Sequence, residues 1–170
     1  MPLEVLHREQ HQVIGIYEGV CLAVRWAVFV ESDAVAYRRA FAKLQRRCPA
    51  GMGFLNVNRF LPAKTVGMDD AAQSAMFGVL STYGATIRII ALLLPDNPFV
   101  AASLRSTYAR MANTAKIRLN VQLFVELGEA VNEVCETLNT ADQPLLRPVD
   151  LAAAVEELAL QRLSPINSTR

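Results

Sequence analysis

The chain has 170 residues, 52% of them hydrophobic, and a formal net charge of +1. This length predicts one domain with a substantial core. No apolar run reaches the roughly 18 residues of a membrane-spanning helix, because Arg25, Arg88 and Pro95 interrupt the best candidates. The first residues lack the apolar region of a secretory signal, so we expect a cytoplasmic protein.

The cysteines favour the same compartment. Cys21, Cys48 and Cys135 are odd in number and stand at unrelated spacings. This pattern argues against a disulfide framework and predicts reduced thiols.

Charges are segregated along the chain although they nearly cancel. No acid occurs between Asp33 and Asp69, whereas the segment from Glu126 to Glu157 contains eight acids and one base, Arg147. Opposite blocks of this kind pair within the fold, pair across a dimer, or attract different partners. The sequence leaves these three alternatives open.

The chain opens with two β-rich runs, Gln12 to Glu18 and Val20 to Phe29, separated by Gly19. Since glycine tolerates positive φ, we expect an antiparallel hairpin that turns at this residue. Ser32 or Asp33 then caps a helix whose apolar residues recur at steps of three and four. These residues are Ala34, Tyr37, Phe41, Leu44 and Cys48, and the opposite face carries Arg38, Arg39, Lys43, Arg46 and Arg47.

The middle of the chain contains the strand around which the fold is organised. A third strand is expected at Gly53 to Asn58 and an acid-capped helix near Asp69 to Tyr83. The following run, Ile87 to Leu94, is apolar except for Arg88 and is closed by turn residues. Such a run is typical of a strand covered on both faces, so we place it inside the sheet.

The last third repeats the pattern of strand and helix. Asn97 and Pro98 are expected as the N-cap and first residue of a third helix. A strand at Lys116 to Phe124 follows at the spacing of a βαβ crossover, and a fourth helix is expected near Val125 to Leu138. After a polar linker, a further helix is expected near Val149 to Leu163.

These elements predict an α/β fold with a mixed five-stranded sheet. An opening antiparallel hairpin leads into βαβ crossovers, four helices cover the sheet, and one more helix is appended at the C-terminal end.

The motifs for common chemistry are missing. His7 and His11 have i, i+4 spacing, but Arg8 and Gln10 stand where the zinc-protease motifs need glutamate. Two exposed histidines ahead of the first strand are the ordinary interpretation. The glycines around Met52 precede a strand instead of following one, unlike a dinucleotide fingerprint. We therefore expect no metal site, no cofactor and no catalytic residues.

Candidate partner contacts lie in two places. In open sheets, ligands tend to meet the loops after the carboxyl ends of the strands. The second place is the basic face of the first helix. This face could attract nucleic acid, an anionic lipid surface or an acidic protein. Alternatively, it is solvated or pairs with the glutamates of the fourth helix. Because it lacks interleaved aromatic residues, we expect no nucleic acid. The loop residues are Asn58, Arg59, Lys64, Thr65, Asp69, Asp96 and Asn97, and the helix residues are Arg38, Arg39 and Lys43.

The order of elements from Gln12 to Asn139 resembles the STAS and STAS-like family, which includes the anti-sigma-factor antagonists. The resemblance rests on topology and on the character of Ile87 to Leu94 and Lys116 to Leu138. Antagonist-type members carry a phosphorylatable serine at the start of a helix, whereas the corresponding stretch here, Thr65 to Ala71, has none. The resemblance implies a small non-enzymatic module that binds a partner protein, or in some members a small ligand, through this region.

We therefore expect a non-catalytic interaction or regulatory module that forms a homodimer and binds a protein partner. Residues 1–139 are expected to form the STAS-like domain, and residues 140–170 a linker, helix and tail packed on that domain or on a partner. The alternative is a small-molecule or lipid-binding protein, or an enzyme of unfamiliar type, with an apolar pocket between the C-terminal helix and the sheet. Tyr17, Trp26 and Phe54 would then line the pocket.

Overall fold

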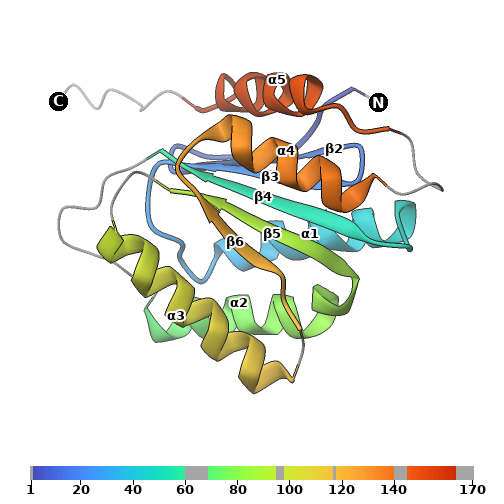
Figure 1. Ribbon diagram of the computed structural model, residues 1–170. Helices are drawn as coiled ribbons and strands as arrows, with labels where there is room; N and C mark the ends of the chain where they lie inside the picture. The colour runs from blue at the N-terminus through green and yellow to red at the C-terminus, as the bar shows by residue number, and fades with distance from the viewer. Residues whose placement is uncertain (1, 60–68, 95–97, 117, 140–144, 164–170) are drawn as a thin grey trace, which may run out of the picture.

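One mixed sheet of six strands runs through the molecule, with helices on both faces (Figure 1). The computed structural model describes residues 2–59, 69–94, 98–116, 118–139 and 145–163. The strands follow one another across the sheet in chain order. They are β1 Glu4–Arg8, β2 Gln12–Tyr17, β3 Val20–Arg25, β4 Met52–Asn58, β5 Ile87–Leu93 and β6 Val121–Phe124.

The first three strands are antiparallel and the last four are parallel. β2 pairs with both β1 and β3 in antiparallel fashion, and β3, β4, β5 and β6 form parallel pairs. The predicted hairpin is present, but the positive φ of its turn lies at Glu18 (50°) and not at Gly19. The prediction of a turn at Gly19 was therefore correct, but the residue in the left-handed conformation is its neighbour Glu18.

Three helices lie on one face of the sheet because of this strand order. A right-handed crossover between adjacent parallel strands that always advance in one direction places its helix on the same face each time. α1, α2 and α3 make these crossovers, and α4 and α5 cover the other face (Figure 1). Their bounds are α1 Asp33–Arg47, α2 Asp70–Tyr83, α3 Pro98–Ala115, α4 Leu127–Leu138 and α5 Pro148–Ala159, with a short 3-10 turn at Gly84–Thr86.

The expected α/β class is confirmed, but the expected counts differ from the structure. The sheet has six strands instead of five, because Glu4–Arg8 forms the edge strand β1. The described residues form five α-helices when the C-terminal one is counted with the others. The last strand is also shorter than expected, Val121–Phe124, and Lys116, directly after α3, has a positive φ of 52°. Ile87–Leu93 does lie inside the sheet, between β4 and β6.

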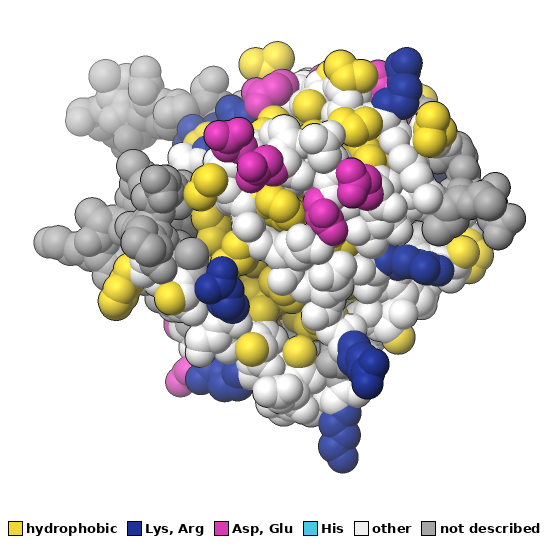
Figure 2. Space-filling view, in the orientation of Figure 1, with side chains coloured by type: hydrophobic (Ala, Val, Ile, Leu, Met, Phe, Trp, Pro, Cys, Tyr) yellow, Lys and Arg dark blue, Asp and Glu magenta, His cyan; other side chains and the backbone are white. Residues whose placement is uncertain are grey.

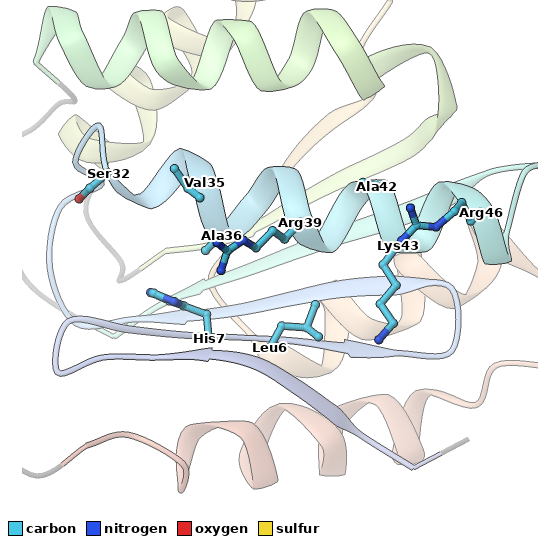
Figure 3. Close-up of a pocket in the computed structure, with 9 residues that line it drawn as sticks. All are labelled: Leu6, His7, Ser32, Val35, Ala36, Arg39, Ala42, Lys43 and Arg46. Atoms are coloured by element: carbon cyan, nitrogen blue, oxygen red, sulfur yellow. The ribbon is translucent and has the colours of Figure 1, made fainter.

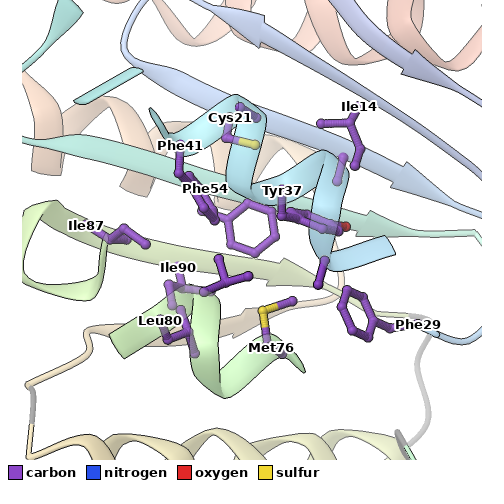
Figure 4. Packing of buried hydrophobic residues seen from close by; sticks show 14 of the residues in the cluster. Ile14, Cys21, Phe29, Tyr37, Phe41, Phe54, Met76, Leu80, Ile87 and Ile90 are labelled. Atoms are coloured by element: carbon purple, nitrogen blue, oxygen red, sulfur yellow. The ribbon is translucent and has the colours of Figure 1, made fainter. Parts of the chain in front are cut away.

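Side-chain alternation along the strands builds two apolar layers. Phe54 of β4 packs on the α1–α3 side with Tyr37 and Phe41, at ring-centroid distances of 5.4 Å and in edge-to-face arrangements (Figure 4). Leu55 and Val57 of the same strand face α4 and α5. Because both faces are covered, the central strands carry apolar residues almost without interruption.

Gly53 allows α4 to approach β4 closely. A Cβ atom at this position would lie 2.9 Å from Leu138 Cδ1 and 3.5 Å from Val134 Cγ1. The first distance is shorter than a normal contact between carbon atoms, so a side chain here would force the Leu138 side chain of α4 to move.

The C-terminal helix is part of the sheet's cover. α5 contacts α4, β2 and β3, and its residues Leu151, Val155 and Leu158 are fully buried. The Asn139 side chain accepts a bond from the backbone N of Leu146 (2.7 Å) and donates one to its carbonyl (2.8 Å), which holds the end of α4 next to the residues that lead into α5. None of the described helices has both the length and the apolar character needed to cross a membrane.

Candidate functional site

A groove runs between the outer flank of α1 and the edge strand β1, with a volume of about 490 Å³ (Figure 3). We call it the basic groove. The helical residues that line it recur at steps of three and four and so share one stripe of α1, beside the stripe that faces the core. The lining residues are Leu6, His7, Ser32, Val35, Ala36, Arg39, Ala42, Lys43 and Arg46.

A β-bulge directs His7 into this groove. Val5 pairs with Gly15 and His7 pairs with Ile14, so Leu6 is an extra residue in β1. Strict alternation would place Leu6 and His7 on opposite faces of the sheet. With the bulge, Leu6 packs against the α1 side while His7 lines the groove, as Figure 3 shows. The Nε2 atom of His7 is buried and has no hydrogen-bond partner among the described residues.

The groove carries an excess of positive charge. Lys43 Nζ bonds to Glu4 Oε1, and Arg47 Nη1 lies 2.9 Å from Glu4 Oε2. The hydrogen bond from Lys43 is the main cause that lowers the pKa of Glu4, so this carboxylate stays ionised. Arg39 and Arg46 are exposed and make no ion pair within the described part of the chain.

The basic face of α1 does not pair with the glutamates of the fourth helix, which was one of the expected alternatives. α1 and α4 lie on opposite faces of the sheet. Figure 2 shows acidic side chains gathered over the α4 and α5 side of the molecule. Of these acids, Glu156 pairs with Arg59 at 2.5 Å and Glu133 accepts a bond from Gln122 at 2.8 Å. The sheet thus separates the cations of α1 from the glutamates of α4, whereas Arg59, after β4, joins the two charge blocks through its pair with Glu156.

A buried polar network anchors the start of α1 next to the groove. Arg25 follows Cys21 and Ala23 on the α1 face of β3, and both Arg25 and Asp33 are 2% exposed. Arg25 Nη2 lies 3.0 Å from Asp33 Oδ2, and Nη1 donates to Gln12 Oε1 (2.9 Å) and to the hydroxyl of Tyr37 (3.2 Å). We call these four residues the buried network.

Electrostatics keep the network in defined charge states. Burial raises the pKa of Tyr37 to about 12, against the opposing effect of Arg25, so its phenol is neutral at physiological pH. For Arg25, burial alone would lower the pKa, but Tyr37 and Asp33 outweigh it and the net pKa is raised. Asp33 Oδ2 also accepts from the backbone N of Val30 (3.0 Å), which closes the turn before α1.

A chain of histidines and carboxylates leads from the network to the surface. His11 Nε2 lies 2.8 Å from Asp33 Oδ1 and its Nδ1 lies 3.1 Å from Glu9 Oε2. A neutral imidazole has one N–H and donates only one of these bonds, whereas the protonated ring donates both. His7 Nε2 lies 3.3 Å from Glu9 Oε1, without hydrogen-bond geometry. The expectation of two exposed histidines ahead of the first strand is therefore wrong, because His7 is within β1 and both side chains are less than one-third exposed, 26% and 29%.

Glu9, His11 and Asp33 bring ligand atoms within 4.8 Å of one another, a set that could hold a divalent cation. Both carboxylate oxygens of Asp33, however, already accept hydrogen bonds. Its Oδ1 accepts from Gln12 Nε2 at 2.7 Å, and its Oδ2 accepts from the guanidinium of Arg25. A cation would have to displace these bonds beside a buried positive charge, so we assign this cluster to the structure of the α1 start.

The three thiols are poor nucleophiles. Burial raises the pKa of Cys21 far above its ordinary value, raises that of Cys135 to about 11, and raises that of Cys48. The thiolate is the reactive form, so these cysteines are protonated at neutral pH. His7 and His11, which might have activated a nucleophile, contact carboxylates instead.

The predicted loop residues that the structure describes already have partners within the fold. Asn58 Nδ2 donates to the carbonyl of Leu93 (3.2 Å), Arg59 pairs with Glu156, and Asp69 caps α2 by accepting from Ala72 N (2.7 Å). The strand order does not reverse among the described strands, so the sheet has no crevice of the kind that a reversal creates. Lys64, Thr65, Asp96 and Asn97 lie outside the described residues.

The helix residues divide between the two flanks of α1. Arg39 and Lys43 line the basic groove, while Arg38 lies on the other flank, where its Nη2 is 3.0 Å from the position that a Cβ of Gly78 would occupy in α2. Sequence reasoning assigned no site role to Arg46, His7, Gln12 or Asp33. One signal was present: Arg25 interrupts an apolar strand, and a charge there requires a buried partner.

The residues of the alternative pocket are also separated. Tyr17 and Trp26 pack in the layer of α4 and α5, whereas Phe54 belongs to the layer of α1, α2 and α3. Successive residues of a strand point to opposite faces of the sheet. Because Phe54 lies on one face and Tyr17 and Trp26 on the other, the three side chains do not line a common cavity.

A scan of protein-family models and searches of curated proteins and of solved structures found no match for this chain.

Proposed function

We propose that this protein is a non-catalytic, STAS-like interaction module that binds an acidic segment of a partner protein in the basic groove. The observation that carries the proposal is the pair Arg39 and Arg46, two exposed guanidinium groups in one groove that make no ion pair in the described part of the chain. Arginine forks suit carboxylates because they donate two parallel hydrogen bonds.

The walls of the groove support binding without a large rearrangement. The buried network ties the start of α1 to β2 and β3 through Asp33, Gln12 and Arg25. The other end of the helix is held to β1 by the contacts of Lys43 and Arg47 with Glu4. A helix held at both ends presents its basic stripe in a fixed position, which lowers the entropic cost of binding.

A non-catalytic role agrees with the chemistry of the described residues. Burial raises the pKa values of the Cys21 thiol and of the Tyr37 and Tyr108 phenols, so these core groups stay protonated at neutral pH. The histidine and carboxylate cluster is occupied by contacts that hold α1 in place.

Self-association is the second part of the proposal. Val149 is 67% exposed and Leu160 is 84% exposed on the outer side of α5 and at its end. Large apolar side chains at such exposure favour contact with another surface. Light scattering on the purified protein tests this part, and a monomer over the whole accessible concentration range would refute it.

The groove is tested by binding of a fluorescein-labelled polyglutamate peptide, measured by anisotropy at several salt concentrations. We expect Arg39→Glu/Arg46→Glu to weaken binding by about tenfold or more, because the reversal replaces attraction with repulsion. The matched control is Arg105→Glu/Arg118→Glu, which makes the same change in net charge at two exposed positions elsewhere.

The control decides between a site and a general charge effect. We expect it to retain affinity within about twofold, because exposed charges more than a Debye length from the groove are screened. Equal losses in the two double variants, or no binding of polyglutamate by the wild type, would refute the groove as the binding site.

A further inference from the structure

The basic groove lies along a strand edge with one unused side. β1 pairs with β2 and is the first strand of the sheet in the described part of the chain. Figure 3 looks onto this edge, with α1 above β1 and α5 below it. The outward backbone groups of such a strand are a template for one more strand.

The dimensions of the groove fit an extended chain. Its helical lining extends from Ser32 to Arg46, fourteen residues apart, which corresponds to roughly 21 Å along α1. An extended segment of six residues covers about 20 Å. A compact ligand would fill only part of this length.

The charges fit a particular pattern in that chain. Residues that share a face of a strand are about 6.7 Å apart, and the rise from Arg39 to Lys43 along α1 is about 6 Å. Acidic residues at alternate positions would therefore face successive cations of the groove, with Lys43 sharing its three donor hydrogens between Glu4 and the partner. The small residue Ala42 lies between Arg39 and Lys43, and Ala36 lies one turn before Arg39, so the lining beside the cations leaves room for a strand to approach the helix.

From these observations we propose that the groove receives an extended partner segment with acidic residues at alternate positions, which pairs with the outer edge of β1 as a seventh strand. This inference rests on the proposed function and specifies its ligand. Backbone bonds to β1 would supply affinity, and the stripe of Arg39, Lys43 and Arg46 would select the acidic side chains.

The bulge at Leu6 makes this edge selective. A bulge increases the local twist of an edge strand, and such irregularity together with charges such as Arg8 discourages indiscriminate pairing. A partner segment that follows this twist, with its acids toward α1, is favoured over a flat or basic one.

The test compares acetylated peptides of identical composition. The first is Thr-Glu-Thr-Glu-Thr-Glu-Thr, and the control is Thr-Thr-Glu-Glu-Glu-Thr-Thr, which has the same charge without alternation. We expect the alternating peptide to bind at least about fivefold more tightly, and the difference to disappear in Arg39→Glu/Arg46→Glu.

Backbone methylation of the peptide separates strand addition from charge attraction. In a strand, the N–H groups of alternate residues point to the same edge. Methylation of the Glu amides and methylation of the Thr amides should therefore differ, with one set abolishing binding and the other tolerated. Amide hydrogen exchange within Glu4–Arg8 should also slow by about tenfold at alternate positions when the peptide is saturating.

The outcomes distinguish this inference from the proposed function. Binding that depends on Arg39 and Arg46, but shows no preference for alternation and no protection of β1, would overturn the seventh strand and leave the groove as a site. Loss of all acidic-peptide binding would overturn both. Protection of β1 that rises with protein concentration in the absence of peptide would show that a second copy occupies the edge, and would also overturn the inference.

Discussion

Asp33 is the acceptor on which the buried network depends. Its two oxygens lie within 3.0 Å of Arg25 Nη2, Gln12 Nε2, the backbone N of Val30 and His11 Nε2. Asp33→Ala removes all four contacts at once. Arg25, which is 2% exposed, is then left as an uncompensated buried charge.

The expected loss of stability is large. Removal of one partner of a buried ion pair costs about 3–5 kcal/mol, because the remaining charge has neither its partner nor water. Some of the stranded donors will reach water after local opening, so we expect a loss of about 4 kcal/mol in the free energy of unfolding. The double variant Arg25→Met/Asp33→Ala removes the stranded charge as well, and we expect it to be more stable than Asp33→Ala by about 2 kcal/mol.

Urea unfolding followed by far-UV circular dichroism measures these differences. With a slope of about 2 kcal/mol per molar urea, a loss of 4 kcal/mol lowers the midpoint by about 2 M. Glu136→Ala, an exposed acid on α4, is the control, and we expect it to change stability by less than about 0.5 kcal/mol. A loss below about 1 kcal/mol for Asp33→Ala, or a double variant no more stable than that single variant, would show that Arg25 does not depend on Asp33 for its charge.

Three further predictions concern packing, capping and pH. Gly53→Ala should lower the free energy of unfolding by about 1–3 kcal/mol because the added methyl group meets α4, whereas Gly128→Ala, with open space around it, should be neutral or stabilising in the same urea assay. Asp69→Ala should cost about 1 kcal/mol through loss of the α2 cap, and Ser32→Ala, whose side chain makes no cap bond, is its control. Because the pKa of Tyr37 is raised to about 12, its phenol ionises between about pH 10 and 12 in the unfolded state and stays neutral in the folded state. The free energy of unfolding should therefore fall as pH rises through this window. Tyr37→Phe should show a shallower fall, and an unchanged slope would contradict the raised pKa of Tyr37.

The fold class was accessible from sequence because local patterns decide it. The apolar run at Ile87–Leu93 and the helical stripe that includes Tyr37 and Phe41 both lie where periodicity placed them. β1 was missed for a physical reason. As a bulged edge strand beside solvent, its residues Glu4, His7 and Arg8 give neither an apolar run nor strict alternation.

The candidate site was only partly accessible. Arg39 and Lys43 were recognised from the charge pattern, and the structure places them in the basic groove. His7 and Glu4 reach α1 from a strand about 35 residues earlier in the chain, and the pairing of β1 at the sheet edge decides their position. No local pattern contains that information. The proposed STAS-like relationship also rests on the order of the elements and not on a local motif. Binding of a partner protein would test the function that it implies.

The return of α5 to the first strands has a consequence for biosynthesis. Every sheet pairing joins strands adjacent in the chain, so the sheet can grow stepwise as the polypeptide leaves the ribosome. α5 covers β2 and β3, and Arg162 Nε donates to the carbonyl of Gln10 (2.8 Å) across almost the entire chain. A nascent chain that ends at Asn139 should therefore have an assembled sheet on which α4 covers β4 to β6, while the apolar surface of β2 and β3 that α5 covers is still exposed. Such a chain should bind the dye ANS until the last helix is made.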